Sequence, residues 1–341
     1  MFYCGIDLSA RDSHLCVLDD TLSIHLQQKS PNELPLIAHL LLPFKPLLQI
    51  VVESTFNWYW LVDGLQHLGF DLCLAHTLGL SLITKAKVKT DRRDAFTLAK
   101  LLRAGVIPKA YIYPVETRPV RDLLRRRLQL VQLRAQEYGS LRQLLLREGI
   151  LTSSRNEIKH SDDDDLHKWF SHPLIVLNAS LQIERIELLT AQISQLEQAI
   201  LELTRQNADY KRLQDIPGVG RLLALTILYE VGEVSRFSNV RQFSSYCRLV
   251  PGVAQSGAVT RRGRASKQGN AYLKSAFSQA AVVAVRSYPR IRSCYERQLQ
   301  RHRGSARKLV AYGVIAHKLA QAAYHLLKNE TQYREELLFG K

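Results

Sequence analysis

Four acidic residues stand at positions where carboxylates could meet. Asp7 follows the first apolar residues of the chain, and Glu53 follows the apolar run 48–52. Burying an unpaired carboxylate is costly, so each acid is expected to face a cation. Asp91 and Asp94 are three residues apart in a segment of helical spacing, which places them on one helix face. In a mixed sheet the first two acids can lie side by side, so all four are candidates to converge.

Such a cluster would repel itself unless it held cations, and hard oxygen ligands favour Mg²⁺ or Mn²⁺ over zinc. Two such ions can flank a scissile phosphate and stabilise both the attacking and the leaving oxygen. The pattern therefore predicts a metal site for phosphate chemistry. For an isolated pair of acids three apart, the alternative is ion pairing with the neighbouring cations Lys89, Arg92 and Arg93.

A serine stands before a dense basic stretch in the last third of the chain. Ser256 precedes Gly257, and four cations follow it: Arg261, Arg262, Arg264 and Lys267. Arginines around a hydroxyl can steady phosphate charge and favour the alkoxide needed to attack a phosphodiester. The segment is therefore either a nucleophile loop or a loop that only binds phosphate.

The segment 216–220, Ile-Pro-Gly-Val-Gly, is followed by several leucines. This pattern is typical of a helix-hairpin-helix turn, in which exposed backbone N–H groups at a helix start hold a DNA phosphate. Gly218 and Gly220 are therefore candidate nucleic-acid-binding residues. The alternative is a glycine-rich turn that only starts a helix.

The elements that must position these residues begin with strands. Strand-like segments lie at 3–8, 14–18, 22–26, 48–52 and 70–74. The first three are separated by short polar breaks, which predicts an antiparallel meander. An amphipathic helix at 56–68 and a helical segment from Leu80 to about Gly105 alternate with the later strands. The N-terminal part is therefore predicted to be a mixed α/β sheet.

The rest of the chain is predicted to be mostly helical. A long helix at 119–149 carries arginines on its polar side: Arg121, Arg125, Arg126, Arg127, Arg134, Arg142 and Arg147. The polar segment 152–165 is predicted to be a linker. Between 181 and 205 apolar residues step by three and four, the spacing of a coiled coil. This stripe favours self-association, and its alternative is an ordinary amphipathic helix packed on its own domain.

Composition narrows the class of partner. The 341 residues exceed one usual domain, and 47 Lys and Arg against 31 Asp and Glu give a net charge of +16. Such an excess favours a polyanion, nucleic acid or an anionic membrane. Residues 241–310 hold fifteen cations and one acid, Glu296. The longest apolar stretch, 34–52, is interrupted by prolines and cannot span a bilayer. Five scattered cysteines and no export signal predict a protein without disulfides in the cytoplasm.

Together these motifs resemble the DEDD transposase family of bacterial insertion sequences, which includes pilin-gene invertases and RNA-guided recombinases. The resemblance covers most of the chain and is most specific at 89–95 and 261–270. It implies an α/β plus α fold: an RNase-H-like (RuvC-like) catalytic domain at 1–112, a helical and coiled-coil region at 113–205, and a helical transposase domain at 206–341.

The same resemblance implies the residue roles. Asp7, Glu53, Asp91 and Asp94 match the family's four metal-binding acids, and Ser256 matches its serine nucleophile, with Ser266 in reserve. The basic residues already named, together with Lys89, Arg92 and Arg93, would bind nucleic acid. The family further implies Mg²⁺ or Mn²⁺, DNA as substrate, a guide RNA, and assembly into dimers or tetramers away from membranes.

Three other functions remain open on the sequence alone. A junction resolvase or structure-selective nuclease would use the same acids to activate water and would need no serine. A sugar-kinase-like ATPase has a first phosphate loop similar to 5–9, although the net charge disfavours it. A non-catalytic nucleic-acid scaffold would tolerate loss of all four acids.

Overall fold

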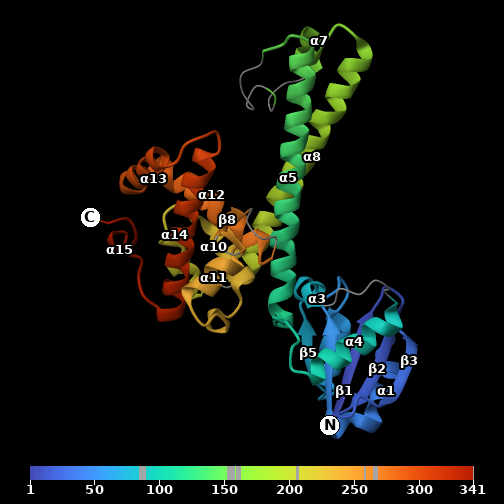
Figure 1. Ribbon diagram of the computed structural model, residues 1–341. Helices are drawn as coiled ribbons and strands as arrows, with labels where there is room; N and C mark the ends of the chain where they lie inside the picture. Colours follow the sequence, from blue (N-terminus) through green and yellow to red (C-terminus); the bar gives the residue numbers. More distant parts are fainter. Residues whose placement is uncertain are drawn as a thin grey trace. The chain divides into compact units, whose positions relative to one another are not determined.

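The protein is described here by a computed structural model that covers residues 1–83, 90–151, 158, 163–204, 207–256, 259–263 and 268–340; for 252–256 and 259–263 it gives the backbone path. The chain forms two compact units, Met1–Val115 and Glu116–Lys341, blue to cyan and cyan-green to red in Figure 1. More than one unit was expected from the chain length. The three-part division at 112 and 205 stays a prediction.

The N-terminal unit is built on a six-stranded mixed sheet of order β3-β2-β1-β4-β5-β6. Its strands are β1 (Phe2–Leu8), β2 (Asp12–Asp19), β3 (Ile24–Pro31), β4 (Leu48–Glu53), β5 (Asp71–Ala75) and β6 (Lys109–Ala110). The first three strands are antiparallel, β4 is parallel to β1, and β5 is parallel to β4. The predicted meander and mixed sheet are confirmed, although β3 runs to Pro31 and not only to Leu26.

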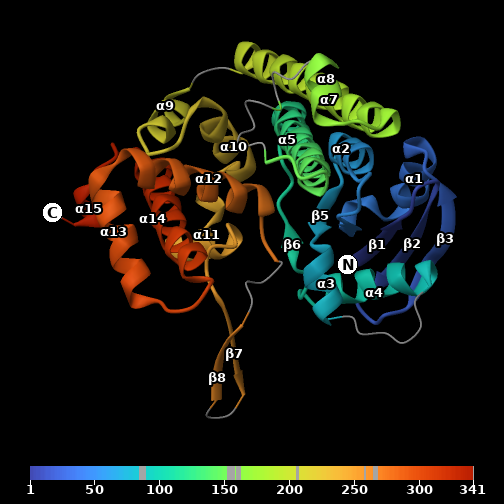
Figure 2. The same cartoon turned by 90° about the horizontal axis from the view of Figure 1, so that it is seen from above.

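Helices cover both faces of this sheet. They are α1 (Leu34–Leu41), the 3-10 helix η1 (Leu42–Leu47), α2 (Tyr59–His67), α3 (Thr77–Ile83) and α4 (Asp91–Arg103). Successive strand residues point to opposite faces, so Ile50 and Val52 join the core under α1 and α2, whereas Val51 packs with Leu98 of α4. Figure 2 shows α4 on the side of the sheet opposite α1 and α2. Residues 50–52 of β4 are all apolar because both faces of the strand are buried there.

The segment predicted to be helical from Leu80 contains two helices, α3 and α4. The second begins at Asp91, inside the segment 89–95 that resembles the transposase family most specifically. Thr90 caps α4, because its side-chain oxygen accepts a hydrogen bond from the Arg93 backbone N–H at 3.4 Å. Asp91 and Asp94 therefore lie in the first turn, where the positive end of the helix dipole stabilises negative charge. Residues 84–89 lie outside the described part of the chain.

α4 packs closely against β1 at Gly5. A Cβ atom at this position would lie 2.1 Å from the Ala95 carbonyl oxygen and 2.6 Å from the Ala99 backbone nitrogen. These are helix backbone atoms, which cannot move aside individually, so the approach of α4 to the sheet depends on a glycine here.

We expect Gly5→Ala to lower the free energy of unfolding of the N-terminal unit by about 2–3 kcal/mol, because the added methyl overpacks the contact with α4. Gly139→Ala is the matched control. Its Cβ would meet no atom within 4 Å, and alanine in a helix interior is more stable than glycine by about 0.5–1 kcal/mol. Thermal and urea denaturation followed by circular dichroism compares the two. Equal stability of Gly5→Ala and wild type would contradict the close packing.

The two edge strands of the sheet are unlike its centre. On β3, exposed polar side chains face solvent, and Lys29 pairs with Asp12 of β2 at 2.8 Å before the strand ends at Pro31. At the other edge β6 is only two residues long, and it pairs antiparallel with Leu74 and Ala75 of β5.

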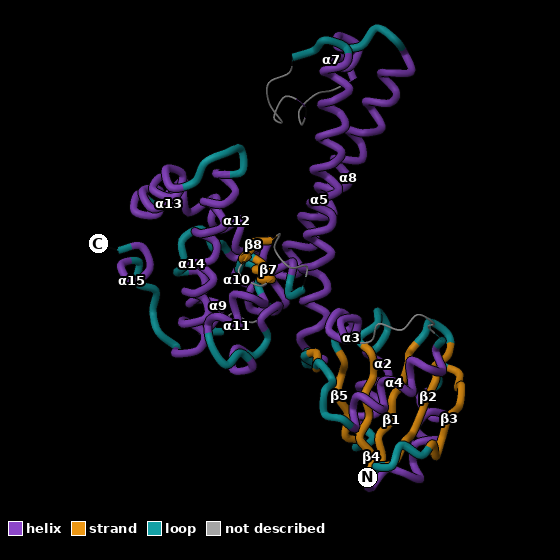
Figure 3. The backbone as a smooth tube through the Cα atoms, in the orientation of Figure 1, coloured by secondary structure: helices purple, strands orange, loops and turns teal. Residues whose placement is uncertain are grey.

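Over its described residues the C-terminal unit is helical apart from one hairpin, as Figure 3 shows in purple and orange. A short 3-10 helix, η2 (Val115–Thr117), leads into it. Its elements are α5 (Arg118–Arg147), α7 (Asp163–Trp169), α8 (Pro173–Leu203), α9 (Ala208–Gln214), α10 (Arg221–Val231), η3 (Val234–Arg236), α11 (Val240–Tyr246), β7 (Gly252–Ser256), β8 (Val259–Gly263), α12 (Ala271–Ser287), α13 (Pro289–Arg301), α14 (Arg307–Asn329) and α15 (Glu336–Phe339). Residues of α10, α12 and α14 form most of its main core.

The predicted linker at 152–165 is wrong at its end, where Asp163 begins α7. Aspartates suit the first turn of a helix, and the next turn buries Leu166, with Phe170 buried just beyond the helix. Most of the preceding segment lies outside the described residues.

The heptad stripe of α8 packs on α5 of the same chain. Side-chain contacts run in opposite directions along the two helices: Arg127 with Glu197, Arg134 with Thr190, and Glu137 with Arg185. Ile186, Leu189, Ile193 and Ile200 of the stripe are buried, whereas Leu203 is exposed. An intrachain antiparallel helix pair therefore accounts for the stripe, and the stripe gives no support for self-association.

None of the helices among the described residues is long and apolar enough to cross a membrane. All five cysteines are free thiols, as their spacing predicts.

Candidate active site

Asp7 and Glu53 lie at one edge of the N-terminal unit, at the carboxyl ends of neighbouring parallel strands. In the parallel ladder between β1 and β4, the last pair is Ile6 with Val52. Each acid is the next residue of its strand. Both acids are partly exposed. The fold therefore brings together the two strand-end acids that the sequence singled out.

A histidine that the sequence analysis missed connects this strand end to α4. His14 of β2 lies directly opposite Asp7 in the antiparallel ladder. Its Nδ1 lies 3.7 Å from Asp91 Oδ2, and this nitrogen is buried without a hydrogen-bond partner among the described residues. The register of a tight hairpin between the first two strands was the signal that could have revealed it, because opposite residues share one face.

The first turn of α4 thus lies beside His14, the residue opposite Asp7. Asp91 is exposed and Asp94 partly exposed. Between described residues, neither acid forms an ion pair with Arg92 or Arg93, which are both exposed. The predicted nucleic-acid ligand Lys89 lies outside the described part of the chain.

The donor chemistry of this edge fits a hard divalent cation. Four carboxylates are the ligands that Mg²⁺ and Mn²⁺ prefer, and the buried, unpartnered Nδ1 of His14 is a polar atom that calls for a partner. Among the residues that the structure describes, however, no three His, Cys, Asp or Glu side chains gather closely enough to hold a metal ion. The acids share an edge, and their convergence on a metal stays a prediction.

Ser256 lies at the end of a hairpin in the C-terminal unit. It is the last residue of β7 and pairs with Val259 of β8, so residues 257–258, which lie outside the described part, connect the strands. Arg261 and Arg262 are on β8. In Figure 2 the hairpin extends away from the helices of its unit. Three further candidates lie outside the described residues: Arg264, Ser266 and Lys267.

Packing explains one of the two glycines in the predicted helix-hairpin-helix turn. Gly218 has a φ of +80°, and a Cβ there would lie 2.1 Å from the Ala280 carbonyl oxygen of α12. Gly220 is exposed, precedes α10 as its N-cap without a side-chain cap, and has open space around it. Phosphate binding at Gly220 stays a prediction, whereas Gly218 is required by the fold.

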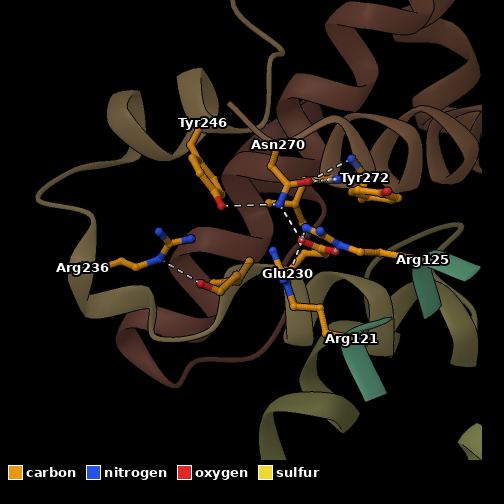
Figure 4. A network of polar contacts seen from close by, with 9 residues as sticks. Arg121, Arg125, Glu230, Arg236, Tyr246, Asn270 and Tyr272 are labelled. Atoms are coloured by element: carbon orange, nitrogen blue, oxygen red, sulfur yellow. Dashed lines mark hydrogen bonds and ion pairs between the residues drawn. The ribbon is translucent and has the colours of Figure 1, made fainter. Parts of the chain in front are cut away.

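The arginines of α5 are not all on a polar, outward side. Arg121 is buried, and both it and Arg125 bind Glu230 of α10, as Figure 4 shows. Arg127 and Arg134 bind α8. The predicted basic polar side is therefore not free at these four positions, because acceptors on α8 and α10 pair with them inside the unit.

Glu230 is the centre of a buried polar network. Its side chain is 1% exposed and accepts hydrogen bonds from Arg121 Nε at 3.2 Å, Arg125 Nε at 2.5 Å and Asn270 Nδ2 at 2.7 Å. Burial opposes ionisation of this carboxyl, but the hydrogen bond from Arg125 and the charges of both arginines outweigh it and hold its pKa below the ordinary value. Glu230 is therefore a buried carboxylate.

We expect Glu230→Ala to lower the free energy of unfolding of the C-terminal unit by about 3–5 kcal/mol at neutral pH, because it leaves two arginines without their buried counter-charge. A carboxyl whose pKa is depressed by folding stabilises above its ordinary pKa, and that stabilisation is lost as pH falls through the folded value. The deficit of the variant should therefore shrink in acid. Urea titrations between pH 7 and pH 3 measure it, with the exposed Glu233→Ala as control. A constant deficit across this range would contradict an ionised Glu230.

Comparison with known proteins finds transposase matches over both units of the chain. A transposase family model of the IS110 DEDD type matches residues 4–149, and the model "Transposase IS116/IS110/IS902 family" matches residues 210–296. A "Probable family 20 transposase" of Pseudomonas aeruginosa is 28% identical over 275 residues, covering 76% of this chain and 80% of the relative. The "Transposase for insertion sequence element IS1111A" of Coxiella burnetii is 29% identical over 261 residues, covering 72% and 68%.

The mixed sheet with its edge of acids, the helical unit with its hairpin, and these matches together define a DNA transposase. The chain belongs to the IS110 family of DEDD transposases.

Proposed function

We propose that this transposase cuts and rejoins the DNA of an insertion sequence through Ser256, assisted by a divalent metal ion held at the four acids. The observation that carries the proposal is the placement of Asp7 and Glu53 one residue beyond the last pair of the parallel β1–β4 ladder, with the first turn of α4 beside His14, the residue opposite Asp7. That turn carries Asp91 and Asp94.

We also propose that the N-terminal unit has the RNase-H-like fold. Support comes from its sheet, in which three antiparallel strands are followed by strands parallel to the first, and from helices on both faces. In this proposal 1–112 is the catalytic domain, 113–205 the helical connection and 206–341 the transposase domain.

Asp7, Glu53, Asp91 and Asp94 would hold Mg²⁺ or Mn²⁺. When bound, the ion would stabilise negative charge on the phosphate that is cut. Arg261, Arg262, Arg264 and Lys267, with Lys89, Arg92 and Arg93, would hold DNA phosphates, so affinity should fall steeply with salt.

The covalent step exchanges one phosphodiester bond for another. The Oγ of Ser256 loses its proton and bonds to phosphorus, while the bond from phosphorus to one sugar oxygen breaks and that oxygen takes up a proton. The phosphoserine joint keeps the bond energy, so a hydroxyl of a second DNA end can attack it and release the serine. A guide RNA for target choice and a dimer or tetramer complete the proposal, by resemblance to the family.

The test uses the full chain, Mg²⁺ and DNA that carries the ends of the element encoding it, with co-purifying RNA retained. A denaturing gel and peptide mass spectrometry detect protein–DNA adducts, and sequencing detects joined strands. An adduct with joined products supports the proposal. Free ends without an adduct would instead identify a metal-dependent nuclease that activates water.

We expect His14→Ala to weaken Mn²⁺ binding by about tenfold, because groups that orient metal ligands contribute about 10–100-fold to affinity. His14 Nδ1 lies 3.7 Å from Asp91 Oδ2, and His14 is opposite Asp7, so its loss removes the side chain that lies between two of the proposed ligands. Calorimetry with Mn²⁺ alone measures this without any turnover. His25→Ala is the control, since His25 pairs with Asp19 at 2.8 Å. Equal Mn²⁺ affinity of the two variants would remove His14 from the site.

A further inference from the structure

The hairpin that carries Ser256 is fixed at its base. On the incoming side Arg248 Nε donates to the Gly269 carbonyl oxygen at 2.9 Å. On the outgoing side the Asn270 backbone N–H donates to the Tyr246 carbonyl oxygen at 2.6 Å. Gly269 has a φ of +95°, and a Cβ there would lie 2.4 Å from that same Tyr246 oxygen. The two ends of the segment 249–268 are therefore held together by one side-chain and one backbone hydrogen bond.

Asn270 extends this base in two directions. Its Oδ1 accepts hydrogen bonds from the Tyr272 and Leu273 backbone N–H groups at 2.9 and 3.0 Å and so caps α12. Its Nδ2 donates to Glu230 Oε2 at 2.7 Å. The residue is buried, so both contacts form away from water, where hydrogen bonds are stronger and their loss is costly.

Glu230 connects Asn270 to two arginines of α5. It binds Arg121 and Arg125, and the Arg125 guanidinium also lies 4.3 Å from the centre of the Tyr272 ring. Figure 4 shows these side chains converging from α5, α10 and the start of α12. α5 is also the helix that directly follows the N-terminal unit in the chain. One continuous polar network thus joins α5 to the base of the hairpin.

We propose that Asn270, Glu230, Arg121 and Arg125 are positioning residues that set the orientation of the Ser256 hairpin relative to α5. They act through the hairpin base and touch no DNA, so they govern the rate of strand cleavage and not the affinity for DNA. The effect on rate rests on the proposed function, whereas the effect on the hairpin base does not.

The substitution Asn270→Asp distinguishes the positioning of the hairpin through Glu230 from the capping of α12. Aspartate caps helices as well as asparagine, but it replaces the donor that faces Glu230 with a second carboxylate. We expect single-turnover adduct formation to fall by about 100-fold, the cost of a misplaced reacting group, while the Kd for DNA changes by less than about threefold. The double variant Asn270→Asp with Glu230→Gln exchanges carboxylate and amide, conserves the total charge and should recover most of the rate.

Asn239→Asp is the matched control. Asn239 caps α11 through the Arg241 and Gln242 backbone N–H groups and is exposed, so its replacement should leave the rate unchanged. Thermal unfolding shows whether each variant is folded at the assay temperature. A folded Asn270→Asp protein that forms the adduct at the wild-type rate would overturn the proposal, as would equal loss in the Asn239 control or no recovery in a folded double variant.

Amide hydrogen exchange in the absence of DNA tests the network independently of chemistry. We expect residues 246–249 and 269–273 to exchange faster in Asn270→Asp and not in Asn239→Asp, with protection restored in the double variant. If the wild-type protein forms no adduct but this pattern holds, the proposed function fails and the positioning network stands. Unchanged exchange at these residues overturns the network even if the wild-type protein is active.

Discussion

Replacing Asp7 with asparagine is expected to lower the rate of Mg²⁺-dependent DNA strand cleavage by about a thousandfold, because an amide cannot supply the negative charge with which a carboxylate holds a catalytic cation. Asp7 stands at the centre of the predicted site, next to Glu53 on the neighbouring strand and opposite His14. Single-turnover cleavage of labelled DNA measures the rate. Gel shifts on the same DNA should show unchanged affinity.

Asp71→Asn is the matched control for this substitution. Asp71 is exposed at the start of β5, where it pairs with Gln49, so it lies at the opposite end of the sheet from Glu53. This variant should cleave at the wild-type rate. Cleavage by Asp7→Asn at the rate of the control would show that the four-acid site is wrong.

Ser256→Ala is expected to abolish the covalent protein–DNA adduct and to slow strand joining by on the order of 10⁴-fold or more, the usual cost of losing a nucleophile. The substitution removes one oxygen at the end of a strand, so folding and DNA affinity should be retained. Adducts are resolved on a denaturing gel, and joined strands are counted by sequencing.

Thr260→Ala tests whether any hydroxyl on the hairpin would serve. Thr260 lies on β8 opposite Gln255, one residue from the pair formed by Ser256 and Val259. Its loss should leave adduct formation within about threefold of wild type, because the proposed step uses the Ser256 hydroxyl alone. If the Ser256→Ala protein still forms the adduct at the wild-type level, and the adduct maps to Ser266, then Ser266 is the nucleophile and the assignment of Ser256 is wrong.

The spacing of apolar residues along the chain predicted much of the fold, because it indicates which face of each strand or helix is buried. The apolar run 48–52 indicates a strand buried on both faces, and Val51 does pack on the face opposite Ile50 and Val52. The placement of Asp7 and Glu53 at strand ends was also predictable, since parallel neighbouring strands end at the same edge. Mixed topology and the long helices therefore followed from periodicity and turn residues, whereas the segment that carries Ser256 was expected to be a loop and forms the β7–β8 hairpin.

Pairings between distant segments could not be predicted in this way. A helical pattern showed arginines on α5, but it held no sign that Arg125 binds Glu230, which is 105 residues later in the chain. The heptad spacing of α8 likewise predicted a partner helix without saying that the partner is α5. The cap at Thr90 decided where α4 begins, and so placed Asp91 and Asp94 in its first turn.

The two edge strands of the six-stranded sheet, β3 and β6, affect whether copies of this protein aggregate when many of them bind the same DNA. A chain of net charge +16 is concentrated along a polyanion, where exposed strands of neighbouring molecules could pair. Lys29 and Pro31 on β3 oppose such pairing with a charge and a missing backbone donor, and β6 offers only two residues. Crowding on DNA therefore should not drive these sheets to aggregate edge to edge.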